Sequence, residues 1–215
     1  MLRSLKQFYG LKLGATDGEI GHIKDFYFDD QNWTIRYLVA DTGTWLTGRK
    51  VLISPTSLAS PAVLGKVVSV GLTRKQIEDS PSIDSQKTVS RQHEEEYYKH
   101  FGWPPYWTGS AAGTIGPQPE REIHVRSTQA VNGYLVRMGD ETIGHVSDFM
   151  MDAEGWTINQ LVVKTGHRLS GKDMLIPTKQ VERISYDEST IFALSSEAPA
   201  KHTPANPLAP AGAIG

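Results

Sequence analysis

The alternation of apolar and polar positions along the chain predicts short β-strands joined by tight turns. Residues 19–29 mix β-branched and aromatic side chains with polar ones, and residues 33–40 resume the pattern after an Asp-Asp-Gln-Asn turn. Such runs on either side of an Asp/Asn cluster are typical of a β-hairpin. We therefore expect a mainly β protein built from small barrels or sandwiches. Further strands are expected at 50–54, 65–70, 173–176 and 190–194.

The hairpin pattern occurs twice in the chain. When the sequence is shifted by 123 positions, residues 20–53 align without a gap with residues 143–176, and half of the aligned positions are identical. The Ile-Gly-His motif at 20–22 and the Trp-Thr-Ile motif at 33–35 both recur in the second copy. Two copies so far apart indicate two similar domains rather than an array of short repeats. We expect their backbones to share one topology.

The rest of the chain differs from these copies in composition. Residues 73–122 form a connector whose beginning carries a Thr-Gln capping box, and residues 90–101 read as a second helix that ends at Gly102. The end of the chain is rich in Ala, Pro and Gly, a composition typical of disorder. The predicted organisation is domain one at 1–72, the connector at 73–122, domain two at 123–197 and a disordered tail at 198–215.

Charge and composition exclude several kinds of site. The chain carries 22 Lys and Arg against 24 Asp and Glu, which gives a net charge of −2 and no basic stripe for nucleic acid. It contains no cysteine, so disulfides, thiol chemistry and zinc–thiolate sites are excluded. No apolar run approaches the ~20 residues of a membrane span, and the N-terminus lacks the apolar core of a signal peptide. We expect a cytoplasmic protein without a membrane span.

Several of these segments resemble a PRC-barrel domain, a family named for the cytoplasmic barrel of the photosynthetic reaction centre H subunit. The resemblance rests on Gly-Glu-Ile-Gly-His-Ile-Lys-Asp at 18–25, Trp-Thr-Ile-Arg-Tyr-Leu-Val-Ala-Asp at 33–41 and Lys-Val-Leu-Ile-Ser-Pro at 50–55. The connector motifs at 89–94 and 102–107 are similar to those of stand-alone bacterial tandem PRC-barrel proteins. The resemblance implies two small antiparallel β-barrels joined by a short helical connector. It carries no catalytic residues over to this chain.

Two pairs of repeated polar residues are candidates for chemistry. His22 and His145 could carry a proton or a metal, but no second ligand accompanies either in the sequence. In a regular strand His22 shares a face with Ile20 and Phe26, so we expect hydrogen-bonded, partly buried imidazoles. The glycine before each, Gly21 or Gly144, suits a β-bulge or a sharp bend. Asp25 and Asp29 recur in copy two as Asp148 and Asp152. Four positions in a strand span ~13 Å, which is too long for a glycosidase pair. Asp29 and Asp152 instead suit the start of a turn. We predict no cofactor and no metal.

Two regions are candidates for contact with a partner. The loop frame Thr-Gly-x-x-Leu-[Thr/Ser]-Gly-basic occurs in both copies with different tips, since Trp45 stands opposite Arg168. Exposed Trp and Tyr residues are typical anchors of interfaces, but the same aromatic residues could pack within the chain, and we favour packing for the connector. The candidate contact residues are Trp45, Arg49, His167, Arg168, Trp103, Tyr106 and Trp107.

The function that we expect is that of a non-catalytic interaction or scaffold module. Its partner would be a protein, in the cytoplasm or at a membrane face as in the reaction centre H subunit. The sequence leaves open whether the chain forms homo-oligomers. The alternative is a factor associated with RNA, because a similar barrel forms part of the ribosome maturation factor. A third hypothesis, an enzyme with a composite site between the two barrels, would require paired carboxylates and histidines in a deep cleft.

Overall fold

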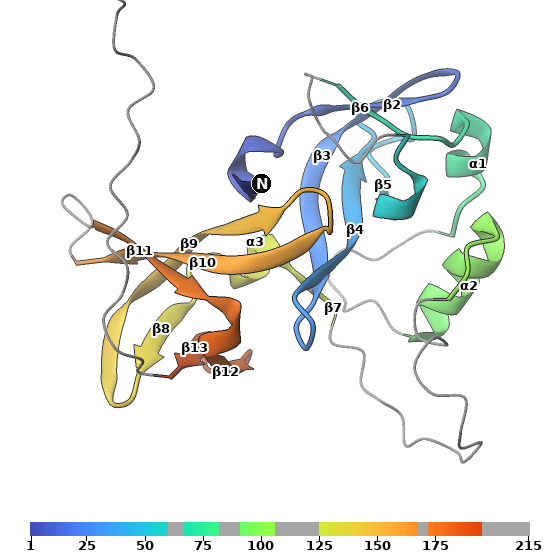
Figure 1. The fold of residues 1–215 in the computed structure, drawn as a ribbon. Helices are drawn as coiled ribbons and strands as arrows, with labels where there is room; N and C mark the ends of the chain where they lie inside the picture. Colours follow the sequence, from blue (N-terminus) through green and yellow to red (C-terminus); the bar gives the residue numbers. More distant parts are fainter. Residues whose placement is uncertain (60–66, 82–90, 106–124, 167–171, 195–215) are drawn as a thin grey trace, which may run out of the picture.

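The computed structural model describes residues 1–59, 67–81, 91–105, 125–166 and 172–194, which form a mainly β structure (Figure 1). This confirms the expected fold class. In these ranges no helix has the length and apolar character needed to cross a membrane. The predicted disordered tail, 198–215, lies outside the described residues.

The first copy and the connector contain the elements expected from their patterns. Thr73 and Gln76 form the predicted capping box, in which each side chain bonds the backbone N–H of the other residue. The elements are β1 (Leu2–Ser4), η1 (Leu5–Gln7), β2 (Lys12–Ala15), β3 (Gly18–Asp29), β4 (Thr34–Asp41), β5 (Lys50–Ile53), η2 (Pro55–Ser57), β6 (Val67–Ser69), α1 (Arg74–Glu78) and α2 (Arg91–Phe101).

The second copy repeats these elements at the same spacing. Its elements are β7 (Val125–Ser127), α3 (Thr128–Val131), β8 (Leu135–Met138), β9 (Glu141–Asp152), β10 (Thr157–Thr165), β11 (Lys172–Pro177), η4 (Thr178–Gln180), β12 (Val181–Ser185) and β13 (Thr190–Ala193). When 123 is subtracted from their numbers, β7, β8, β9 and η4 coincide with β1, β2, β3 and η2. The prediction of one topology for both copies is confirmed.

The strands join into one mixed sheet in the order β12-β13-β8-β9-β10-β4-β3-β2-β6. The expectation of purely antiparallel barrels was wrong in one respect, because β2 pairs with β6, and β8 with β13, in parallel. A parallel pair needs a long crossover connection, and in each copy the intervening hairpin strands supply it. Among the described strands the sheet is open, and β5 pairs with β4 alone.

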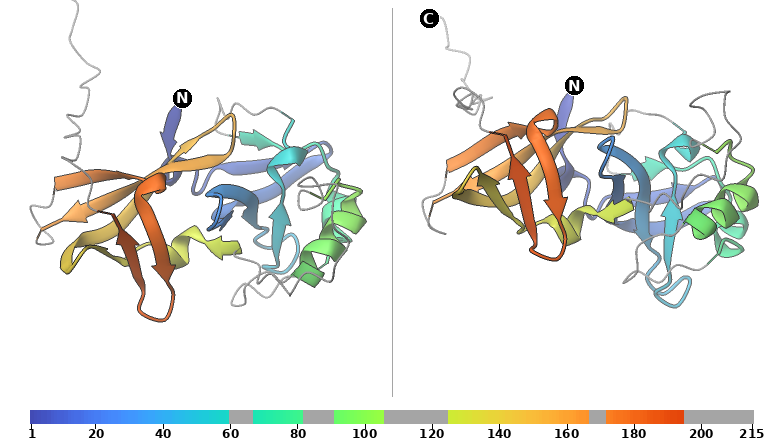
Figure 2. Two further views of the ribbon diagram at one scale, coloured as in Figure 1. Left: turned by 60° about the horizontal axis from the view of Figure 1, so that its bottom comes forward. Right: turned by 90° about the horizontal axis from the view of Figure 1, so that it is seen from below.

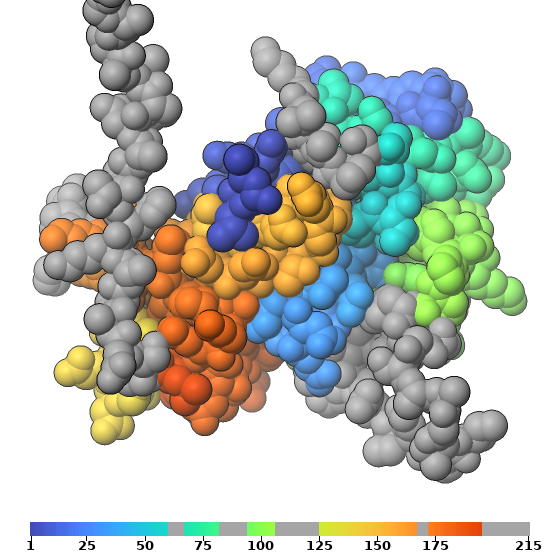
Figure 3. All heavy atoms as spheres, in the orientation of Figure 1, coloured from blue at the N-terminus to red at the C-terminus, as the bar shows by residue number. Residues whose placement is uncertain are grey.

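The first strand of each copy belongs to the sheet of the other copy. β1 pairs with β9, with Leu2 opposite Asp152, and β7 pairs with β3, with Val125 opposite Asp29. The two pairings are equivalent under the shift of 123 positions, so the exchange is reciprocal. Figure 3 shows the N-terminal residues (dark blue) lying against the amber and orange strands of copy two. Each copy is therefore completed by a strand that is remote in sequence.

The two Trp-Thr-Ile motifs meet at the centre of the molecule. Their threonines lie directly opposite one another, where β4 pairs with β10. The Ile35 N–H donates to the Trp156 carbonyl, and the Ile158 N–H donates to the Trp33 carbonyl, both at 2.7 Å. The repeated motif thus forms the junction between the copies, with matching hydrogen bonds on its two sides.

The turn before each motif ends in a left-handed residue. Positive φ falls on Trp33 (56°) and Trp156 (50°), the first residue of the motif in each copy. A left-handed residue turns its own carbonyl relative to the strand, and in both copies this carbonyl accepts the bond from the other copy. In both copies the left-handed residue is thus also the acceptor of the junction bond.

The core is shared between the copies. Phe28 stacks on Trp33 with ring centroids 5.4 Å apart, and it lies 6.0 Å from Phe149 of copy two. Phe8 of copy one likewise contacts Trp156 of copy two, with ring centroids 6.5 Å apart. These residues belong to one buried cluster that includes strands of both copies. A separate, smaller cluster lies under α2, on the other side of the copy-one strands.

Candidate functional site

The side of the copy-one strands that faces away from the shared core is covered by α2 (Figure 2). Tyr97 of α2 is fully buried there, and its hydroxyl accepts a hydrogen bond from the Leu52 N–H at 3.4 Å. The Tyr37 hydroxyl donates to Glu94 Oε1 at 2.7 Å. The outer face of copy one, as we call it, consists of Tyr27, Tyr37, Val39, Leu52 and Val125.

The equivalent surface of copy two has no described helix over it. Its central Val162 is 9% exposed, Leu2 is 39% exposed, and the remaining members are half-buried. None of its members belongs to either buried cluster, whereas every member of the copy-one face does. The outer face of copy two consists of Leu2, Met150, Gln160, Val162 and Leu175.

Trp103 packs back onto copy one together with α2. Its ring stacks on Phe101 with centroids 4.4 Å apart and an angle of 14° between the planes. The backbone N–H of Trp103 donates to the Tyr98 carbonyl at 3.0 Å, and its ring meets the Tyr98 ring edge to face. The expected packing of the connector on the first copy is confirmed at this residue. Contact of Trp103 with a partner stays a prediction.

Trp45 and Arg49 tie their loop to α1. The Arg74 guanidinium lies 4.4 Å from the centroid of the Trp45 ring. Arg49 donates to the Glu78 carbonyl at 2.8 Å and also bonds the Ser80 carbonyl and hydroxyl. Both side chains are half-buried, so each retains surface that a partner could reach. Their role in partner binding stays a prediction.

The other candidate contact residues lie outside the described residues: Tyr106 and Trp107 in the connector, and His167 and Arg168 in the loop of copy two. Their predicted roles stay predictions. The structure therefore describes three of the candidates, with Trp45 and Arg49 beside α1 and Trp103 beside α2.

The repeated glycine before each histidine makes a β-bulge, as we expected. A Cβ atom on Gly21 would lie 2.1 Å from the Asp41 carbonyl oxygen, and one on Gly144 would lie 2.2 Å from the Lys164 carbonyl oxygen. The pairing of β2 with β3, and of β8 with β9, shifts register at this point. Only glycine allows the strands to approach so closely.

The bulge also corrects the expected position of the histidines. We expected His22 to share a face with Ile20 and Phe26 and to be partly buried. The extra residue changes the alternation between Ile20 and His22, because a one-residue slip turns a side chain to the other face. His22 is exposed, while His145 is half-buried. No cluster of three or more His, Asp or Glu residues suitable for a metal occurs in the described ranges.

Asp25 anchors the start of copy two. Its carboxylate accepts hydrogen bonds from Thr128 Oγ1 at 2.9 Å and the Gln129 N–H at 3.1 Å, and also from Ser127 Oγ. It accepts a further bond from the Phe26 N–H. Burial raises the pKa of Asp25, although the hydrogen bonds from Ser127 and the backbone act in the opposite direction.

Asp148 anchors the start of copy one in the same way. It accepts hydrogen bonds from Ser4 Oγ and the Lys6 N–H, the latter at 3.3 Å, and from the Phe149 N–H at 2.8 Å. Both aspartates are 9% exposed. The repeated aspartate of each copy therefore binds the first segment of the other copy, a role that sequence reasoning missed.

Asp29 begins a turn, as predicted. Its Oδ1 accepts from the backbone N–H groups of Gln31 and Asn32 at 3.0 and 3.2 Å. Its Oδ2 accepts from Arg36 at 2.9 Å. Partial burial acts to raise the pKa of Asp29, but the hydrogen bonds from Arg36 and Asn32 outweigh it and hold the pKa below its usual value. Asp152 accepts from the Gly155 N–H at the equivalent turn.

A cavity of about 350 Å³ opens at the junction between the copies. It lies where β4, η2 and α2 of the first part of the chain meet the β9–β10 turn. Its charged lining residues are Arg36, which is already bonded to Asp29, and Glu154. This pair offers a polar edge for binding, but it does not combine a nucleophile with a base.

The two copies match a known protein family. The family model of the PRC-barrel domain matches residues 4–71 and again residues 131–198, together more than half of the chain. The chain belongs to the PRC-barrel family. Both PRC-barrel segments contain the central hairpin and the parallel strand pair of their copy. The exchanged strand β7 precedes the second match, yet it completes the first PRC-barrel copy. A search of curated proteins found no match.

Proposed function

We propose that this tandem PRC-barrel protein is a non-catalytic interaction module that binds a protein partner through copy two. Membership of a family of general interaction modules supports a binding role. The proposed setting is the cytoplasm, including the cytoplasmic face of a membrane.

The observation that carries the proposal is the difference between the two outer faces. Equivalent residues are buried under α2 in copy one and have no described cover in copy two. Leu2 is exposed, and Met150 and Leu175 are half-buried, so apolar side chains keep accessible area together on this face, as is typical of an interaction site. The two copies share their framework, so the difference in cover marks the outer face of copy two for contact with another molecule.

The hydrogen bonds of the repeated aspartates support binding over catalysis. Asp25 and Asp148 are each occupied by donors from the exchanged segments, and Asp29 is bonded to its own turn and to Arg36. A catalytic carboxylate must be within hydrogen-bond reach of its substrate. These carboxylates instead serve the framework.

Site-specific photo-crosslinking in native cells tests the proposal. A photo-reactive amino acid at Gln160, on the outer face of copy two, should give a discrete crosslinked protein. The same group at Glu182, an exposed residue of β12, is the matched control and should give none. Absence of a crosslink at Gln160, or equal crosslinks at both sites, would contradict the proposal. A crosslink to RNA instead of protein would favour the ribosome-associated alternative, and a salt-dependent gel shift would check it.

A further inference from the structure

We propose that the outer face of copy two docks an amphipathic helix of a partner protein, in the way that α2 docks on copy one. The helix would present aromatic side chains to the sheet and an acidic residue one turn earlier. This inference rests on the proposed function and specifies the chemistry of the partner.

The internal symmetry shows what kind of element fits this face. Under the shift of 123 positions, Met150 replaces Tyr27, Val162 replaces Val39 and Leu175 replaces Leu52, so the centre of the face stays apolar. Leu2 of the exchanged strand replaces Val125 at the edge. On copy one this arrangement is buried by an α-helix, and its aromatic side chains belong to the same cluster. The same framework in copy two offers a helix an equivalent apolar surface.

The edge of the sheet offers a polar contact of the same kind. Among the described strands, β5 pairs with β4 alone, and the Leu52 N–H at its other edge donates to the Tyr97 hydroxyl of α2. Within the described part of copy two, β11 likewise pairs with β10 alone. Its Leu175 occupies the position of Leu52. A tyrosine of the docking helix can therefore accept a hydrogen bond from this edge, as Tyr97 does in copy one.

The charges beside the face suit an acidic helix. Pro177 stands opposite Gln160, and exposed Lys179 follows in η4, so one cation lies near the Gln160 end of the face. Lys164 and Asp173 stand opposite each other across the strand pair and carry opposite charges, so together they add no net charge to the face. In copy one, α2 carries Glu94 beside the hydroxyl of Tyr37, the equivalent of Gln160. A carboxylate at the same place on a partner helix would lie on the side of Lys179.

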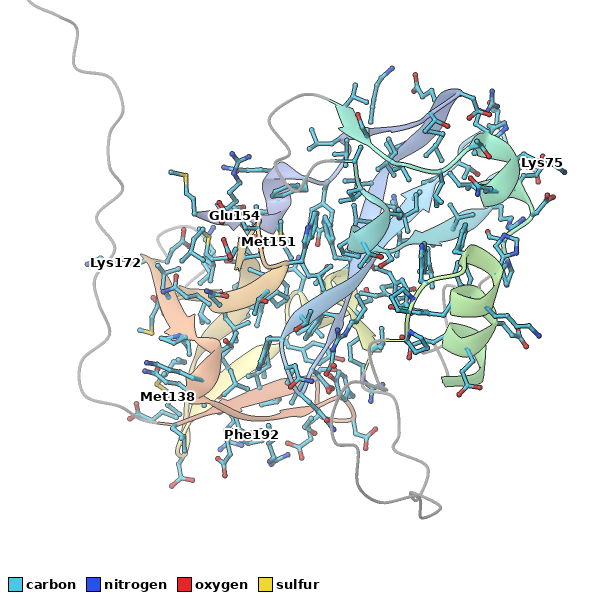
Figure 4. All side chains as sticks on the ribbon, turned by 45° about the vertical axis from the view of Figure 1, so that its right-hand side comes forward. Lys75, Met138, Met151, Glu154, Lys172 and Phe192 are labelled. Carbon is cyan, nitrogen blue, oxygen red and sulfur yellow. The ribbon has the colours of Figure 1, made fainter. Side chains whose placement is uncertain are left out.

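The described helices of this chain do not supply the cover. Both α1 and α2 lie on the side of copy one in the views of Figure 2. In Figure 4, Lys172 marks the outer end of β11, on the opposite side of the molecule from Lys75 of α1. The occupant that we propose is a helix of another protein.

A peptide with the sequence of residues 90–103 of this chain provides the probe. It contains Glu94, Tyr97, Tyr98, Phe101 and Trp103, the residue types that cover copy one. Fluorescence anisotropy with the labelled peptide and the full chain should show saturable binding. Circular dichroism should show the peptide gaining helix when bound, because an isolated helix of this length is marginal in water. A control peptide with the four aromatic residues replaced by serine should not bind.

Substitutions on the full chain locate the site. Leu175→Glu and Met150→Glu should each weaken peptide binding by about tenfold or more, because they place a charge in an apolar contact. Leu135→Glu, the same change at an exposed leucine of β8, should leave it unchanged. Gln160→Tyr restores the tyrosine found at the equivalent position of copy one and should strengthen binding. Thermal melting shows whether each variant is folded. Leu175→Glu and Met150→Glu change different residues of the same face, so either one tests the site if the other fails to fold.

Three outcomes would overturn this inference. Absence of saturable binding would do so, as would binding that Leu175→Glu and Met150→Glu leave unchanged, since the peptide would then sit elsewhere. In sedimentation, a dimer of the full chain that Leu175→Glu dissociates would assign the face to a second copy. If a protein crosslinks at Gln160 while the peptide fails to bind, the proposed interaction function stands and only the helical partner is wrong.

Discussion

At the residue scale, a buried carboxylate in each copy holds the first turn of the other copy. Asp25 receives donors from Ser127, Thr128 and Gln129, and Asp148 receives donors from Ser4 and Lys6. A buried acceptor that satisfies several donors is costly to remove, because each donor then loses its hydrogen bond without regaining water. The two aspartates therefore hold the exchanged segments in place.

Asp148→Ala is expected to destabilise the whole chain by about 2–4 kcal/mol, since Ser4 Oγ and two backbone N–H groups lose their acceptor. Urea unfolding followed by tryptophan fluorescence measures the change. Asp187→Ala, at an exposed aspartate, is the control and should change stability by less than about 0.5 kcal/mol. Equal effects of the two substitutions would contradict the proposed role of Asp148.

Arg36→Gln is expected to cost about 1–2 kcal/mol at neutral pH, because it removes a partly buried, charge-assisted bond to Asp29. The folded pKa of Asp29 is lowered, so its contribution is present above the ordinary carboxyl pKa of about 4 and is lost as the pH falls through the folded value. The difference between wild type and Arg36→Gln should therefore disappear in acid. Asn159→Gln, at the equivalent position of copy two, should show no such pH dependence.

At the element scale, α2 and Trp103 form a cover that belongs to copy one. The helix buries Tyr97 and Tyr98 against the sheet, and Trp103 closes over Phe101 at its end. Aromatic residues give large apolar contact areas and specific ring geometry, so a short helix can cover this face. Its contacts explain why an aromatic connector follows the first copy.

Trp103→Ala is expected to cost about 2–3 kcal/mol, somewhat below the value for a fully buried tryptophan, because the side chain is only half-buried. Lys99→Ala, at an exposed position of the same helix, should be nearly neutral. Thermal melting of both variants gives the comparison. If Trp103→Ala melts like the parent but loses its crosslinked partner, Trp103 is a docking residue and not part of the cover.

At the scale of the whole molecule, the copies are joined in three ways. They exchange β1 and β7, they pair β4 with β10, and they share one apolar cluster. Neither copy can lose its fold without exposing apolar surface and backbone edges of the other. We therefore expect the two PRC-barrel copies to unfold as one cooperative unit.

We expect a single unfolding transition in urea, with coincident curves from far-ultraviolet circular dichroism and tryptophan fluorescence. Ile158→Val, at the fully buried junction, should lower stability by about 1 kcal/mol and shift both curves equally. Two resolved transitions, or a shift confined to one probe, would show that the copies unfold independently.

The local pattern was sufficient for the elements and for the repeat. Alternating side chains, the Asp-initiated turns, the capping box at Thr73 and the glycine bulges were all predictable, because each depends on neighbours in sequence. Sequence reasoning placed His22 on the wrong face, because the extra residue of the bulge changes the alternation by one position. It also missed the buried roles of Asp25 and Asp148, whose donors lie more than one hundred residues away.

The sequence by itself determined the family, the mainly β class and the equivalence of the two copies, since these follow from residue order and from a repeat visible in one chain. Only the tertiary structure decided that β1 pairs with copy two and β7 with copy one. It also decided that α2 covers the outer face of copy one, whereas no described helix covers that of copy two. A strand's pattern specifies which side is apolar but not which edge it joins, because backbone hydrogen bonds are the same for every partner. The identity of that partner depends on how both copies bury their cores together.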